Sequence, residues 1–176
     1  MNILVCIKQV PDTTEIKIDP VKHTLIREGV PSIVNPFDAC ALEMAVRLKE
    51  KEGGKVIVIS MGPAQAKNAL KECLAVGADQ AFLVTDRAFG GSDTLATSYI
   101  LSRAIAAVEA KTGEKFDLIF CGKQAIDGDT AQVGPEIAEH MDLPHVTLAT
   151  AVEMADGKLH VTRDTDEGHD LVEVSL

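Results

Sequence analysis

The 176-residue sequence contains no tryptophan and only one tyrosine. Few aromatic side chains are therefore present on which nucleic-acid bases could stack. The formal net charge of −10 points the same way, because an acidic surface repels a phosphate backbone. No apolar run approaches the ~20 residues of a membrane-spanning helix. We therefore expect neither a nucleic-acid-binding protein nor a membrane span.

Signals for secretion and for a metal centre are also missing. The first ten residues, MNILVCIKQV, have no basic segment before the apolar run and no small-residue cleavage site. The four cysteines, at positions 6, 40, 73 and 121, form no CxxC or Cys/His cluster, and each lies in an apolar context. We expect buried free thiols in a reducing cytoplasm, with no metal site and no disulfide.

Four short apolar runs, separated by helical patterns, dominate the first three quarters of the chain. The runs lack polar alternation, which indicates strands buried on both faces, and helices are expected to begin near Asp38, Pro63 and Ser92. Asp38 and Ser92 are expected to be N-caps. This pattern predicts a single α/β domain, with a mostly parallel sheet and helices on both faces. The predicted strands cover residues 3–8, 55–60, 81–85 and 117–121.

Two segments have a different pattern. Polar and apolar residues alternate between 16 and 27, which predicts a small exposed hairpin, 16–19 against 24–27. After Pro144 the chain is typical of antiparallel strands that turn near 155–157 and 167–168. The predicted fold therefore includes C-terminal antiparallel β-hairpins.

Hydrogen-bonding residues and glycines are concentrated in the segment KQAIDGDTAQVG, residues 123–134. It lies between a predicted strand and a predicted helix, and parallel sheets bind ligands beyond the carboxyl ends of their strands. If the helix begins near Gln132, Pro135 lies in its first turn, and the backbone N–H groups of 130–134 can receive phosphate. Gly128 and Gly134 would allow close backbone approach to a ligand.

The polar side chains of this segment allow more than one interpretation. Thr130 and Gln132 can hydrogen-bond phosphate or ribose, whereas Asp127 and Asp129 suit ribose hydroxyls, a cap or a bond within the loop. Turn chemistry alone could also explain the composition, and neither GxGxxG nor a Walker A motif is present.

Other strand-to-helix connections are expected to meet at the same edge of the sheet. In one of them Thr97 lies one turn beyond Thr94, on the same helix face. This convergence favours a binding site. The connections are 6–9, 35–38, 62–64 and 90–94.

Several motifs, in order, resemble the β subunit of electron-transfer flavoproteins: IKQVPD, NPFD, VISMGP and CGKQAIDGDTAQVGPEIAEHMDLP. The resemblance covers the whole chain, and the GKQAID block with QVGP is its most specific part. It implies a Rossmann-like adenine-nucleotide-binding domain over residues 1–176 and a heterodimer with an α subunit. That complex would carry electrons from flavin-dependent, acyl-CoA-type dehydrogenases to an acceptor. Family members are longer, so this chain would be their N-terminal part without the C-terminal arm.

The resemblance also implies a ligand set, mostly through backbone atoms. In conventional members the site is thought to hold AMP, and in the electron-bifurcating branch a second FAD. Gly128, Thr130, Ala131 and the GGSDTLAT segment favour the bifurcating branch, in which Thr94 and Thr97 would border the isoalloxazine ring near Phe37. The implied contacts are Cys6, Asn35, Pro36, Phe37, Asp38, Ala66, Lys123, Gln124, Ala125, Ile126, Asp127, Gly128, Asp129, Thr130, Ala131, Gln132, Val133 and Gly134.

The expected cofactor is FAD, with AMP as the alternative. Since the flavin carries the chemistry, no residue is assigned a catalytic role. The chain would be an electron carrier, with NADH-oxidising bifurcation only in the complete heterodimer. Two other functions stay open. The first is a regulatory nucleotide-binding module of stress-protein-like architecture, although its G-x2-G-x9-G-(S/T) pattern is missing. The second is an adenylating enzyme of the pyrophosphatase type, although GGSDT is only loosely similar to the SGGxDS loop of such enzymes.

Overall fold

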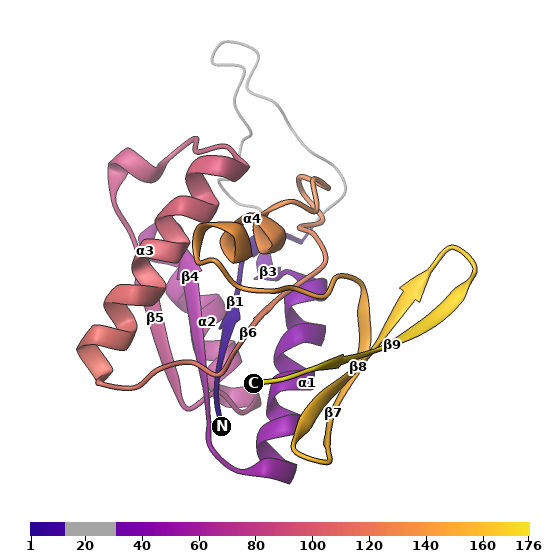
Figure 1. Ribbon diagram of the computed structural model, residues 1–176. Helices are drawn as coiled ribbons and strands as arrows, with labels where there is room; N and C mark the ends of the chain where they lie inside the picture. The colour runs from indigo at the N-terminus through magenta and orange to yellow at the C-terminus, as the bar shows by residue number, and fades with distance from the viewer. Residues whose placement is uncertain (13–30) are drawn as a thin grey trace.

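A four-stranded parallel sheet forms the centre of the computed structural model, which describes residues 1–12 and 31–176 (Figure 1). The hairpin expected at 16–27 lies outside the described residues. The strand order is β5-β4-β1-β6, and every neighbouring pair is parallel. All four strands predicted from the apolar runs are present, with ends shifted by one or two residues. They are β1 (Asn2–Cys6), β4 (Lys55–Met61), β5 (Gln80–Val84) and β6 (Leu118–Cys121).

Helices cover both faces of this sheet, so the predicted α/β architecture is confirmed (Figure 1). Alternate residues of β1 and β4 supply the two cores: Ile3 and Val5 face the first helix pair, and Leu4 faces the second. The first pair is α1 (Pro36–Glu52) and α2 (Lys67–Val76), and the second is α3 (Thr94–Thr112) and α4 (Val133–His140). Short 3₁₀ turns are η1 (Ala64–Ala66) and η2 (Arg87–Phe89).

Two expected N-caps are wrong. Asn35 directly precedes α1, so Asp38 lies inside the first turn, and its carboxylate bonds to other elements. Helix α3 begins only at Thr94, and the residue next to it, Asp93, caps it by accepting the N–H of Ala96 at 2.8 Å. Ser92 instead donates its hydroxyl to the carbonyl of Phe89 at 2.9 Å.

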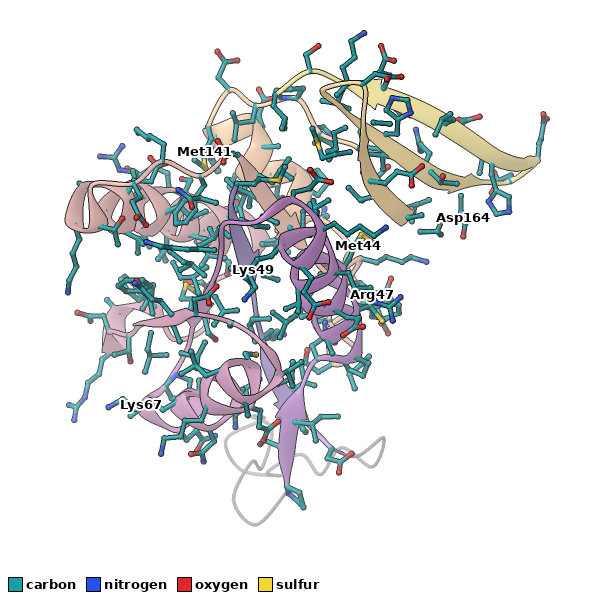
Figure 2. The ribbon with its side chains drawn as sticks, turned by 90° about the horizontal axis from the view of Figure 1, so that it is seen from below. Met44, Arg47, Lys49, Lys67, Met141 and Asp164 are labelled. Carbon is teal, nitrogen blue, oxygen red and sulfur yellow. The ribbon has the colours of Figure 1, made fainter. Side chains whose placement is uncertain are left out.

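The C-terminal part forms the expected antiparallel sheet, with turns at Asp156–Gly157 and at 166–167. Its buried residues Leu159 and Val161 join the core cluster that contains α1. Figure 2 shows this sheet beside α1, the helix that carries Met44 and Arg47. The strands are β7 (Ala149–Ala155), β8 (Lys158–Thr165) and β9 (Gly168–Val174), and a further antiparallel pair is β2 (Gln9–Pro11) with β3 (Ser32–Val34).

Burial differs from expectation at the sheet edges and at two cysteines, the exposed Cys40 and the partly buried Cys121. Strands β5 and β6 are only partly buried, and an open groove of about 540 Å³ runs between β5 and α3. Edge strands have one neighbour instead of two, which explains their exposure. Cys40 is exposed because it lies on the solvent side of α1, whereas Cys6 and Cys73 are buried. Within residues 1–12 and 31–176, every helix is too short or too polar to cross a membrane.

Candidate functional site

One buried side chain, that of Asn35, fixes the loop that follows β6. Its amide nitrogen donates to the carbonyl of Gln124 at 2.8 Å, and its amide oxygen accepts the N–H of Ile126 at 3.1 Å. Its backbone N–H donates to the carbonyl of Lys8, just beyond β1, at 2.9 Å. Asn35 is 1% exposed, so its side chain makes these bonds from inside the protein. The loop is therefore tied to β1 and to the start of α1.

Asp38 makes a second bridge at the same place. Its carboxylate accepts the N–H of Lys8 at 2.7 Å and that of Gly122, and it also contacts the side chain of Asn35. Burial raises the pKa of the Asp38 carboxyl to about 6, although these hydrogen bonds act in the opposite direction. Residue 122 must be glycine, because a Cβ there would lie 2.2 Å from the Asp38 carboxylate.

The loop also holds its own shape. The carbonyl of Ala125 accepts the N–H groups of Gly128 at 3.2 Å and Asp129 at 2.8 Å, and Gln124 donates to the Asp129 carboxylate at 2.7 Å. Asp129 and Ala131 both have a left-handed backbone with φ of 54°. Such a conformation is uncommon outside glycine and often marks a functional loop. Thr130, the exposed residue between them, can present its backbone N–H group to a ligand.

Both loop aspartates are engaged within the site. The Asp129 carboxylate accepts a hydrogen bond from Gln124, and the Asp127 carboxylate accepts one from the ammonium group of Lys8 at 2.6 Å. The sequence left three roles open for these residues: contact with ribose, helix capping and a bond within the loop. In the structure Asp129 makes a bond within the loop, and Asp127 forms an ion pair. Lys8 lies in the connection 6–9 that was expected at this edge, but it was not among the implied contacts, since its partner lies 119 positions away in sequence.

The end of the loop meets helix α3. The hydroxyl of Thr94 lies 3.1 Å from a carboxylate oxygen of Glu136 and 3.3 Å from the amide oxygen of Gln132. Glu136 was also missed, because a charged residue in a predicted helix gave no signal of a site. Thr97 lies further along α3 and is partly buried.

Two glycines in the predicted set have different surroundings. A Cβ on Gly128 would have nothing within 4 Å, so backbone access from solvent is open there. A Cβ on Gly134 would lie 3.2 Å from that of Cys121. Gly134 therefore packs closely against Cys121 of β6, a role that was not expected of it; the approach of a ligand at Gly134 stays a prediction.

Two thiols lie below the loop. Cys6 and Cys121 are register partners at the carboxyl ends of β1 and β6. A hydrogen bond with the Cys121 thiol, together with burial, raises the pKa of the Cys6 thiol well above its usual value. All four cysteines are free.

The remaining predicted positions differ in exposure. Pro36 is exposed, Phe37 is partly buried, and Ala66 is 2% exposed at the end of η1. The structure thus brings Cys6, Asn35, Asp38, Thr94 and the loop to one edge. In the loop, Lys123, Ile126, Gly128, Asp129, Thr130, Ala131 and Gln132 are exposed, and Gln124, Ala125, Asp127, Val133 and Gly134 are partly buried.

Comparison with known proteins identifies similar chains. A family model described as "Electron transfer flavoprotein domain" matches residues 22–176. The chain is 60% identical over 174 residues to "Electron transfer flavoprotein subunit beta" of Thermoanaerobacterium thermosaccharolyticum, covering 99% of this chain and 65% of that protein. It is 54% identical over 177 residues to "Caffeyl-CoA reductase-Etf complex subunit CarD" of Acetobacterium woodii, covering 100% and 66%. It is 52% identical over 179 residues to "Protein FixA" of Azotobacter vinelandii, covering 100% and 63%. The chain spans just under two thirds of the length of these relatives.

The bridge by Asn35 generates a stability prediction. Asn35→Leu should lower the free energy of unfolding by about 1–3 kcal/mol, because it leaves the partly buried carbonyl of Gln124 and N–H of Ile126 without their protein partners. Urea denaturation measures this, with Asn68→Leu, an exposed position on α2, as the matched control. Equal midpoints for the two variants would contradict the assignment of Asn35 as the residue that holds the loop.

Asp38 generates a prediction for pH dependence. Its carboxyl has a pKa of about 6 in the folded protein, against an ordinary value of 3.8, so the folded protein binds the proton more tightly than the unfolded chain does. The contribution of Asp38 to stability is therefore greatest below about pH 4 and is lost as the pH rises to about 6, by roughly 3 kcal/mol.

Asp38→Asn should remove this dependence, whatever its effect on absolute stability. The measurement is the free energy of unfolding at several values between pH 4 and pH 7. Asp170→Asn, at an exposed carboxylate on β9, is the control and should keep the slope of the parent. If Asp38→Asn also keeps that slope, the carboxyl does not titrate in this window.

Proposed function

The chain belongs to the electron transfer flavoprotein family, and we propose that it is the nucleotide-binding part of a β subunit whose carboxyl-edge site holds FAD, with AMP as the alternative. The observation that carries this proposal is the loop after β6. It is exposed, it is fixed by Asn35, and it leads directly into a helix. The family match does not favour the regulatory-module alternative.

Phosphate suits the second half of this loop. The backbone N–H groups near the start of α4 lie at the positive end of the helix dipole, where an anion is favoured. Gly128 leaves the approach open, and the left-handed residues Asp129 and Ala131 set the direction of the chain. Lys8 and Lys123 supply positive charge nearby, although Asp127 neutralises part of that of Lys8.

Three observations favour FAD over AMP. The hydroxyl of Thr94, at the start of α3, contacts Gln132 of the loop. Polar groups are therefore present next to the proposed phosphate site, where the rest of a dinucleotide would lie. Small residues, Gly90 and Gly91, precede that helix. The CarD relative is named as a subunit of a caffeyl-CoA reductase-Etf complex, which is in keeping with the bifurcating branch. Bound flavin would supply the redox chemistry, while the residues of this chain bind and orient it.

The remaining parts of the proposal concern the whole protein. We assign it an α subunit as partner and a flavin-dependent, acyl-CoA-type dehydrogenase in the full-length complex. It would act as an electron carrier, with NADH oxidation confined to the complete heterodimer. The free cysteines suit a reducing compartment, which favours the cytoplasm.

Gly128→Val tests the loop. The added side chain meets no protein atom near its Cβ, so folding should be unchanged, while AMP and FAD should each bind about tenfold more weakly through blocked approach to the backbone. Calorimetry on the purified chain measures both affinities, and Ala75→Val on α2 is the control. Gly134→Val is unsuitable because it would displace α4 from Cys121. Parent-like affinity of Gly128→Val for both nucleotides would place the site elsewhere.

The number of flavins tests the choice of cofactor. The full-length protein assembled with its α subunit should release two FAD per heterodimer on heating. Replacing Thr94 and Thr97 together by leucine should reduce this number to one, because bulk fills the space beside α3. Mass spectrometry and absorbance quantify the released nucleotides. One FAD and one AMP from the unmodified complex would instead establish the AMP alternative.

A further inference from the structure

Asp38 is a buried carboxylate without a counter-ion, at the edge of the sheet that carries the site. It is 7% exposed, and its hydrogen-bond donors are uncharged: the backbone N–H groups of Lys8 and Gly122 and the side chain of Asn35. In the part of the chain that the structure describes, Asp38 forms no ion pair, and the ammonium group of Lys8 pairs with Asp127 instead. Burial without a paired cation disfavours the charged form of a carboxyl group.

The other charged and titratable groups around Asp38 do not reverse this effect. The charge of Lys8 and the positive end of α1, in whose first turn Asp38 lies, both favour the carboxylate. The thiols of Cys6 and Cys73 lie close enough for the Asp38 charge to raise their pKa, so they stay protonated and neutral. Burial outweighs these groups and raises the pKa of Asp38 to about 6.

The start of α4, where the proposed site receives phosphate, is close to this carboxylate. A Cβ on Gly134 would lie 3.2 Å from that of Cys121, and a Cβ on the next residue, Gly122, would lie 2.2 Å from the Asp38 carboxylate. Consecutive Cα atoms are about 3.8 Å apart, so the carboxylate lies on the order of 10 Å from the backbone of Gly134. A phosphate bound at the start of α4 would therefore act on the charge of Asp38.

The sign and size of this interaction follow from electrostatics. Two like unit charges about 10 Å apart, at an effective dielectric constant of about 20, change an equilibrium roughly tenfold. A bound phosphate therefore disfavours the Asp38 carboxylate relative to its neutral form by about that factor. Since the pKa of Asp38 is already about 6, the change falls in the range between about pH 5 and pH 8.

We propose that nucleotide binding at this site is coupled to the uptake of a proton by Asp38. The inference rests on the proposed function, because it requires a phosphate at the loop. The proton comes from the solvent and binds to a carboxylate oxygen, which removes a buried negative charge that would oppose the phosphate. Affinity for the nucleotide should therefore fall about tenfold between pH 5 and pH 8.

Calorimetry in two buffers of different ionisation enthalpy measures the protons taken up on binding. With the purified chain and FAD at pH 6.5, the parent should take up about half a proton. Asp38→Asn should take up none, and Asp170→Asn, at an exposed position on β9, should match the parent. A terminal phosphate such as that of AMP titrates near pH 6 itself. With AMP, the difference in uptake between the parent and Asp38→Asn is therefore the measurement.

A carbon-13 NMR titration of the Asp38 carboxyl in the parent chain needs no variant. Its midpoint should move to higher pH when nucleotide is added. An unchanged midpoint, or equal uptake in the parent and Asp38→Asn, would overturn the inference and leave nucleotide binding intact. Proton release on binding would also overturn it, because the hydrogen bonds of the ionised carboxylate would then matter more than its charge. A chain that binds neither nucleotide would remove the proposed function, and the inference with it.

Discussion

Beyond the carboxyl ends of β1 and β6 the sheet no longer pairs backbone groups, and the first turn of α1 takes over that role. Asn35 and Asp38, one helical turn apart, serve the backbone of Lys8 on one side and of Gly122, Gln124 and Ile126 on the other. Unpaired buried backbone groups are costly, so both chain segments must follow the course that these two side chains allow. The geometry of the site therefore depends on where α1 begins.

This arrangement explains how an acidic protein can present a loop suited to an anion. The loop carries two aspartates, which would repel phosphate if they pointed outward. Asp129 accepts from Gln124, and Asp127 meets Lys8, so each carboxylate is turned toward a donor within the site. The Lys8–Asp127 pair is partly exposed, and such pairs add little to stability. Its main consequence is orientation, because the pair turns the Asp127 carboxylate toward Lys8.

Much of the fold could be predicted because its signals are local. Continuous apolar runs predicted the parallel strands. Alternating polar and apolar residues, together with the turn at Asp156–Gly157, predicted the antiparallel sheet. The errors are at positions whose role depends on distant partners. Asp38 is a residue type typical of an N-cap. Its carboxylate instead accepts the N–H of Lys8, which only the fold brings close to it. The contact of Gly134 with Cys121 was missed for the same reason, since the two residues belong to different elements. Glu136 gives no signal in the sequence, since α3 reaches it only through helix packing.

The two thiols below the loop have a consequence for redox chemistry at this site. A thiol reacts as its thiolate, and in the Cys6–Cys121 pair mutual hydrogen bonding and burial raise the pKa of Cys6. Cys6 therefore stays protonated near neutral pH and is a poor nucleophile. Small sulfur side chains at this place also allow the close approach of α4 at Gly134. In the proposed complex, redox chemistry would therefore be left to the bound flavin, and the Cys6 thiol would take no part in it.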